Sequence, residues 1–198
     1  MKALLVVDVQ NDFMPNGPMA TKGGNEIIPM TNKIMNDFKL VVATQDWHPE
    51  NHGSFAANHE GKKPGDIILL RGLEQILWPT HCVMETQGAD FAPGLNTDRF
   101  TRIFKKGTDP EIDSYSGFHD NGRTRSTGLA DYLRQNKVKQ VTVCGVATDY
   151  CVKFTVLDSL LEGFDTVVLS EACRGVDAKP GDIDKAILEM KEAGAKII

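Results

Sequence analysis

The stretch Val141-Thr142-Val143-Cys144-Gly145-Val146-Ala147-Thr148-Asp149-Tyr150-Cys151-Val152 predicts a buried strand, a turn, and a helix with a cysteine in its first turn. Cysteine is a strong nucleophile only as the thiolate, and the positive end of a helix dipole stabilises a thiolate. The same turn presents backbone N–H groups to an oxyanion. The stretch therefore favours a covalent hydrolase or transferase. Most buried free cysteines serve only packing, so the choice depends on what lies near Cys151.

Strand and helix patterns alternate outward from this stretch. Strands are expected at residues 3–9, 40–44, 102–105, 140–146, 166–169 and 196–198, and helices at 25–38, 126–136, 149–162 and 181–193. This alternation predicts a three-layer α/β/α fold with a central, mostly parallel sheet of about six strands. No linker divides the chain, so residues 1–198 are expected to form one domain with an irregular insertion at about 45–98.

Composition narrows the classes of partner. The formal net charge of −5 disfavours a nucleic acid or an anionic membrane surface. The first apolar run is far too short to cross a bilayer and lacks a signal-peptide cleavage pattern. The four cysteines show no disulfide-framework spacing. Together these features predict a cytoplasmic protein with reduced thiols that binds neither nucleic acid nor membrane.

Four predicted strands each deliver a chemically distinctive residue at or just beyond their carboxyl ends: Asp8, Asp46, Lys106 and Cys151. In parallel α/β sheets, ligands bind in the crevice beyond these ends. We therefore expect the four side chains to converge on one edge of the sheet. Scattered packing residues would not do this.

The chemistry of these residues is complementary. Burial among valines would raise the pKa of Asp8 and suit it to general-base work, although a strand-end aspartate often only bonds a loop. Lys106 can hold carboxylate and thiolate charges in place, and alternation along the strand predicts that Lys105 points away. A solvated face is the ordinary alternative for this lysine pair.

The insertion supplies candidate metal ligands. Asp46 and His48 lie two residues apart on an extended segment, and His81 follows later; two imidazoles with one carboxylate suit a divalent metal. Asp-x-His pairs are also common in ordinary loops. Phe13, Trp78 and Tyr115 are loop aromatics that can wall a flat ring, or pack in a satellite cluster.

Together the motifs resemble those of the nicotinamidase/pyrazinamidase family of isochorismatase-like cysteine hydrolases. They are Leu5–Phe13, Asp46-Trp47-His48, Trp78–Val83, Lys106-Gly107, Asp113–Phe118 and Gly145–Val152. The resemblance runs in order across essentially the whole chain. It implies the isochorismatase-like (Rossmann-like) hydrolase fold.

The resemblance also implies residue roles. Asp8, Lys106 and Cys151 would form a catalytic triad, and the N–H groups of Ala147 and Cys151 an oxyanion hole beside a cis peptide between Val146 and Ala147. Asp46, His48 and His81 would hold one divalent metal, zinc in most members and iron or manganese in others, with His52 or Ser54 as a fourth or water-mediated ligand. Phe13, Trp78, Tyr115 and Val146 would contact the substrate.

The expected activity is deamidation of nicotinamide to nicotinate and ammonia, and of pyrazinamide likewise, through a cysteine thioester in NAD salvage. A homo-oligomer is left open. One alternative is a sister hydrolase that acts on a carbamoyl or ureido amide and needs no metal at His48 and His81. The other is a non-enzymatic α/β signalling module in which Asp8 and Asp12 bind a cation and Lys106 senses a phosphoryl group.

Overall fold

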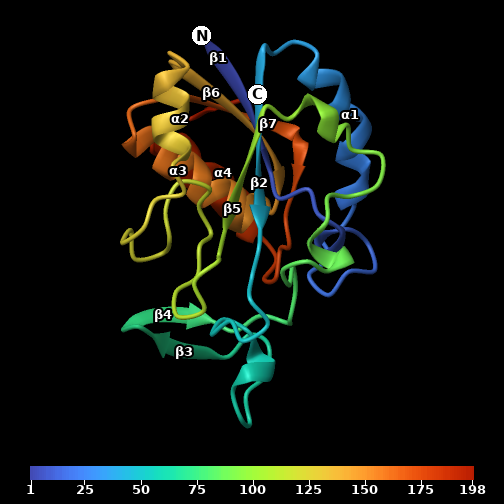
Figure 1. Ribbon diagram of the computed structural model, residues 1–198, viewed down its shortest axis with the longest axis vertical. Helices are drawn as coiled ribbons and strands as arrows, with labels where there is room; N and C mark the ends of the chain where they lie inside the picture. Colours follow the sequence, from blue (N-terminus) through green and yellow to red (C-terminus); the bar gives the residue numbers. More distant parts are fainter.

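The computed structural model describes residues 1–198 and is built on a six-stranded sheet in which every pair of neighbours is parallel (Figure 1). In spatial order the strands are β5 (Arg102–Lys106), β2 (Leu40–Asp46), β1 (Lys2–Val7), β6 (Gln140–Val146), β7 (Asp165–Arg174) and β8 (Lys196–Ile197). Central strands β1, β2 and β6 are buried along nearly their whole length, as their continuous apolar runs require. The predicted sheet is confirmed.

Helices cover both faces of this sheet. Helix α1 (Ile27–Met35) lies on one side, and α2 (Leu129–Gln135), α3 (Lys153–Leu161) and α4 (Asp182–Glu192) lie on the other (Figure 1). Each buries an apolar stripe; α1 does so through Ile27, Ile28 and Met35. Short 3₁₀ turns fill the connections: η1 (Asn11–Phe13), η2 (Gly24–Glu26), η3 (Ala56–Asn58), η4 (Gln87–Ala89) and η5 (Thr97–Arg99). The predicted three-layer α/β/α fold is confirmed.

The helix expected from Asp149 begins differently. Residues Thr148–Val152 form a π-helical turn, η6, in which the Ala147 carbonyl accepts the N–H of Val152 at 3.0 Å. Regular α-helix starts only at Lys153. Cys151 therefore lies in a wide turn ahead of the α-helix, not in its first α-helical turn. Apolar spacing predicts that a helix is present but does not separate a single π turn from the α-helix that follows it.

The insertion was expected to lack regular structure, and this expectation is wrong. It contains an antiparallel hairpin of β3 (Ile67–Leu70) and β4 (Leu73–Ile76), which lies beyond the carboxyl ends of β2 and β5 (Figure 1). The two-residue loop has positive φ at Arg71 (49°) and Gly72 (81°), as a type I′ turn requires. An arginine at the first loop position conceals this turn from sequence patterns.

The crevice of the sheet opens between β1 and β6. From β1 the chain continues to β2 on one side, whereas β6 leads to β7 on the other. The two strands approach closely at Gly145, which has a φ of 127° and no space for a Cβ against the Val7 carbonyl. Asp8 and η6 therefore leave adjacent strand ends, where α/β sheets bind ligands. No helix combines the length and apolarity needed to cross a bilayer.

Candidate active site

Asp8, Lys106 and Cys151 converge in a buried cluster at this crevice. The Lys106 Nζ lies 3.0 Å from Asp8 Oδ2 and 3.5 Å from the Cys151 Sγ. It also lies 3.0 Å from Asp46 Oδ1 and donates to the Ser114 carbonyl at 2.9 Å. Lys106 is only 2% exposed, so its ammonium fixes the charges of the cluster away from water. Lys105, the neighbour expected to point away, is exposed and lies over the Trp47 ring.

Asp8 shares the Lys106 ammonium with the sulfur of Cys151. Its backbone adopts a positive φ of 48°, which is uncommon for a residue other than glycine and is typical of functional sites. Oδ1 accepts a hydrogen bond from the Thr44 hydroxyl at 2.6 Å, whereas no protein donor is aligned with Oδ2. Burial raises the pKa of Asp8, although Lys106 opposes this rise. Oδ2 is therefore the oxygen available to receive a proton.

Cys151 differs in one respect from the sequence prediction, which had Lys106 and a helix dipole stabilise a thiolate. Burial raises the pKa of Cys151 well above the usual range; Lys106 opposes this and the Asp8 carboxylate adds to it. Removing the cysteine from water costs more than one ammonium returns, so burial favours the thiol over the thiolate. Its proton must be transferred as the reaction proceeds.

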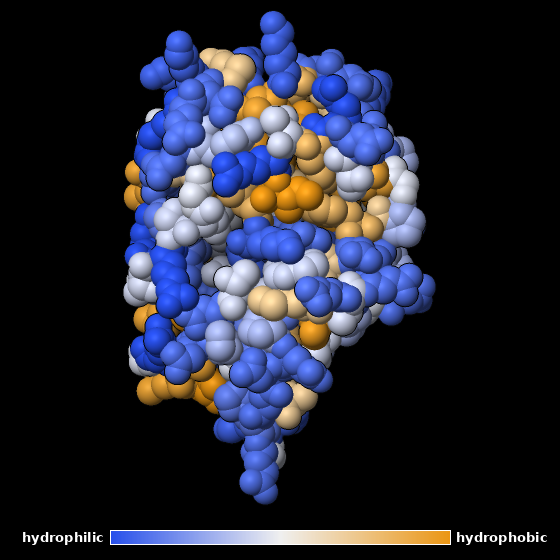
Figure 2. Space-filling model, viewed as in Figure 1, coloured by the Kyte–Doolittle hydropathy of each residue, from blue (hydrophilic) through white to orange (hydrophobic).

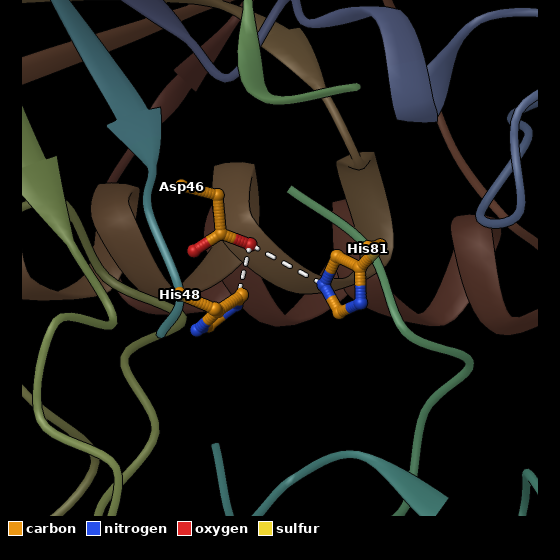
Figure 3. Close-up of side chains that lie close together, drawn as sticks. All are labelled: Asp46, His48 and His81. Carbon is orange, nitrogen blue, oxygen red and sulfur yellow. Dashed lines mark ion pairs between the residues drawn. The ribbon is translucent and has the colours of Figure 1, made fainter. Parts of the chain in front are cut away.

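The predicted metal ligands also come together (Figure 3). His48 Nε2 and His81 Nε2 lie 3.1 and 3.4 Å from the same oxygen, Asp46 Oδ2. In each ring Nδ1 donates to a carbonyl: His48 to Gly107 at 2.9 Å and His81 to Pro79 at 2.8 Å. In the neutral rings both Nε2 lone pairs therefore face a carboxylate. Ligand atoms about 2.1 Å from one metal ion are separated by about 3.0–3.4 Å, so these three groups fit a metal ion.

Charge balance gives a second test of this fit. Asp8, Asp46 and Asp113 are at most 3% exposed, and Lys106 is the only lysine buried among them. When all four are ionised, three carboxylates face one ammonium and leave two negative charges away from water. Asp46 accordingly raises the pKa of His48 even though burial works to lower it. Because buried charges require compensation, the donor set suits a divalent cation.

His52 and Ser54 lie beside this group. The His52 ring packs on His48 with centroids 4.2 Å apart, and its Nε2 has no hydrogen-bond partner in the protein. Its Nδ1 faces the Ser54 hydroxyl at 2.7 Å and accepts the Ser54 N–H at 3.2 Å. Burial and the neighbouring His48 lower the pKa of His52 to about 4. His52 also clusters with His48 and Asp113, as a second group with metal-ligand spacing.

A cavity joins Cys151 to the metal-ligand group. Phe13, Trp78 and Tyr115 line it as predicted, together with Ala147. Val146 is not among the residues that line it, and its side chain is fully buried at the last position of β6. The peptide between Val146 and Ala147 is cis. The N–H of Ala147 donates to no protein acceptor, which leaves it free for an oxyanion.

Sequence reasoning missed four lining residues: Met19, Asp113, Tyr150 and Val176. Asp113 and Tyr150 belong to the motifs around Tyr115 and Cys151, so their positions in the chain gave a signal. Met19 and Val176 lie in loops that border the crevice, and no local sequence pattern predicts that they line the cavity. Tyr150 stacks edge-on against Trp78 at 4.9 Å and extends the aromatic wall.

Comparison with known proteins agrees with this geometry. Residues 2–198 match the isochorismatase domain family. The chain is 44% identical over 200 residues to a nicotinamidase of Escherichia coli (strain K12), covering 99% of this chain and 93% of that protein. A solved Acinetobacter baumanii nicotinamidase/pyrazinamidase superposes with a TM-score of 0.96 at 45% identity, covering 100% and 95%. A Pyrococcus horikoshii pyrazinamidase in complex with zinc gives 0.81 at 43% identity, covering 100% and 98%.

The fold and the strand-end site define a hydrolase, and the chain belongs to the isochorismatase family. Within that family it is a hydrolase of the nicotinamidase type.

Proposed function

We propose that this protein hydrolyses nicotinamide to nicotinate and ammonia, and pyrazinamide likewise, through a thioester on Cys151. The observation that carries the proposal is that one cavity is lined by Cys151 and by the Asp46–His48–His81 group, while Lys106 lies behind Cys151 and pairs with Asp8. The first can cleave an amide, and the second can select a ring nitrogen. A hydrolase of carbamoyl or ureido amides would use only the first.

Acylation begins with proton transfer from Cys151 to Asp8 Oδ2. The sulfur attacks the carboxamide carbon, and the N–H groups of Ala147 and Cys151 stabilise the oxyanion; one such donor is worth about 3 kcal/mol. Asp8 then gives its proton to the departing nitrogen and the C–N bond breaks. Ammonia departs, and the acyl group remains on Cys151 as a thioester. During these steps Lys106 holds the Asp8 carboxylate and the Cys151 sulfur close together.

Deacylation repeats the proton transfers with water. Asp8 accepts a proton from a water molecule whose oxygen attacks the thioester carbon. The C–S bond breaks, Asp8 returns its proton to the sulfur, and the acid product loses its remaining proton to solvent and leaves as nicotinate. Phe13 and Trp78 hold the ring during both steps.

Asp46, His48 and His81 would hold the metal, which we propose to be zinc, with iron or manganese as the other candidates. Bound there, the ion supplies a Lewis acid and an anchor for the ring nitrogen. Of the two candidates for a fourth or water-mediated contact, we propose His52 in the water-mediated role in preference to Ser54, whose hydroxyl already pairs with His52 Nδ1. Because Nδ1 accepts the Ser54 N–H, Nε2 carries the hydrogen of the neutral ring and is free to donate it to a water molecule. We further propose a cytoplasmic role in NAD salvage, and all four cysteines are free thiols.

Removing the metal should abolish the selectivity for ring nitrogen. With nicotinamide we expect chelation to lower kcat/KM about 100-fold or more, and added Zn²⁺ to restore it, since a Lewis acid contributes several kcal/mol. Ammonia release measures this directly. Benzamide, which lacks the ring nitrogen, is the matched control and should turn over slowly with or without chelator. Equal turnover of both amides and indifference to chelator would instead favour the carbamoyl-type hydrolase.

The pH dependence should report Asp8. The base must be ionised, and burial raises its pKa, so kcat/KM should fall on the acid side at a midpoint above the value of about 3.9 for free aspartate. The Thr44 hydrogen bond lowers this pKa. Thr44→Val should therefore move the midpoint to higher pH, and Thr44→Ser should leave it in place. If the pH–rate profile of Thr44→Val matches that of the wild type, ionisation of Asp8 does not cause the fall in kcat/KM at low pH.

A further inference from the structure

The β3–β4 hairpin has two unlike faces. Its outward face carries exposed apolar side chains, with Ile67 60% and Leu69 72% exposed, and Figure 2 shows an apolar patch at its edge. Gln75 in β4 is by contrast only 3% exposed, whereas Glu74 beside it faces solvent. A buried amide in an otherwise exposed hairpin has a structural partner, because burying it unpaired would be costly.

The partners of Gln75 are in the wall of the substrate cavity. Its Nε2 donates to the Ile76 carbonyl at 2.7 Å and lies 3.1 Å from both Asp113 Oδ2 and the Tyr115 hydroxyl. An amide has two hydrogens, so one of them is shared by the last two acceptors. Asp113 and Tyr115 both line the cavity that contains Cys151. Gln75 thus links the hairpin by hydrogen bonds to two residues of the cavity wall.

These contacts determine what the Tyr115 hydroxyl can do. It accepts hydrogen bonds from Gln75 Nε2 and from the indole N–H of Trp78, the latter at 3.2 Å. Both lone pairs are then occupied, and the hydroxyl donates to no protein acceptor, so its proton is free for a ligand. Burial raises the pKa of Tyr115, which keeps that proton in place. Asp113, which shares the Gln75 amide with Tyr115, also accepts the Ser114 N–H.

We propose that the β3–β4 hairpin supports substrate binding in the cavity and that Gln75 is the positioning residue through which it acts. By filling a lone pair of Tyr115 and engaging Asp113, Gln75 directs the Tyr115 proton at an acceptor atom of a planar aromatic amide. The inference rests on the proposed function for the identity of that ligand. It assigns a role to a segment that carries no catalytic or metal-binding residue.

The isosteric change Gln75→Glu tests this proposal. It removes the donor without changing volume and sets a second carboxylate against Asp113. We expect KM for nicotinamide to rise about tenfold while kcat changes less than threefold, because the lost contact serves binding in the ground and transition states alike. Gln75→Leu should act in the same direction. Glu74→Gln, one residue away on the exposed face, is the control and should leave both constants unchanged.

Two further measurements separate positioning from loss of fold and from failure of the proposed function. If Gln75 acts through Tyr115, Gln75→Glu should add little to the KM of Tyr115→Phe. In a Trp47→Phe background Trp78 is the sole indole, and its emission should shift with Gln75→Glu but not with Glu74→Gln, whatever the substrate. Unchanged KM and emission would overturn the inference. A wild-type protein inactive on nicotinamide would overturn the function instead, and the emission would still decide the positioning.

Discussion

Replacing Cys151 with alanine is expected to lower ammonia release from nicotinamide by at least about 10⁴-fold, because no other nucleophile reaches the carboxamide carbon. The Asp46–His48–His81 group does not include the sulfur, so the variant should bind as much metal as the wild type. Turnover and metal content, measured on the same preparation, check both parts. Loss of metal together with activity would mean that Cys151 acts in the metal site.

The control for this substitution is Cys173→Ala. Cys173 is also a buried free thiol, 5% exposed against 7% for Cys151, and burial raises its pKa to about 12. It lies in β7, outside the cavity of the candidate site. Its variant should keep near wild-type turnover. Residual activity in Cys151→Ala comparable with that of Cys173→Ala would end the thioester mechanism.

The strand-end residues were predictable because parallel topology converts position along the chain into position in space. Asp8, Asp46, Lys106 and Cys151 each follow an apolar strand, and the carboxyl ends of parallel strands share one edge. Knowing where the strands end was therefore enough to bring these side chains together. Their ionisation was not predictable in the same way, because the pKa of Cys151 depends on burial as well as on Lys106.

The contacts of the insertion were not predictable. Gln75 contacts Asp113 and Tyr115, which lie about forty positions later in the sequence. The hairpin that carries Gln75 was not predicted, because Arg71 is an unusual residue at the first position of its turn. The hairpin sequence shows no regular alternation of apolar residues, because a two-stranded hairpin with one exposed face buries few side chains. The sequence thus predicts the reactive residues at the strand ends better than the contacts that the insertion makes with the cavity wall.

Lys106→Met is expected to cost both stability and activity. The substitution keeps the length of the side chain but leaves the Asp8 and Asp46 carboxylates without their buried cation. Breaking a buried ion pair on one side costs about 3–5 kcal/mol, which lowers Tm by about 10 °C in a chain of this size. Turnover should fall sharply as well, since the sulfur loses the one charge that opposes the rise in its pKa. Thermal unfolding and ammonia release check the two effects.

The pH dependence of this variant has a definite sign. Without Lys106 the pKa of Asp8 should rise further, so protonation relieves the uncompensated charge, and the stability lost relative to the wild type should shrink as the pH falls. Lys105→Met is the matched control, because Lys105 is exposed, forms no ion pair and lies over the Trp47 ring, a contact worth about 0.5–1 kcal/mol. A Tm loss that is equal for the two lysines, or independent of pH, would show that the ammonium of Lys106 does not balance these carboxylates.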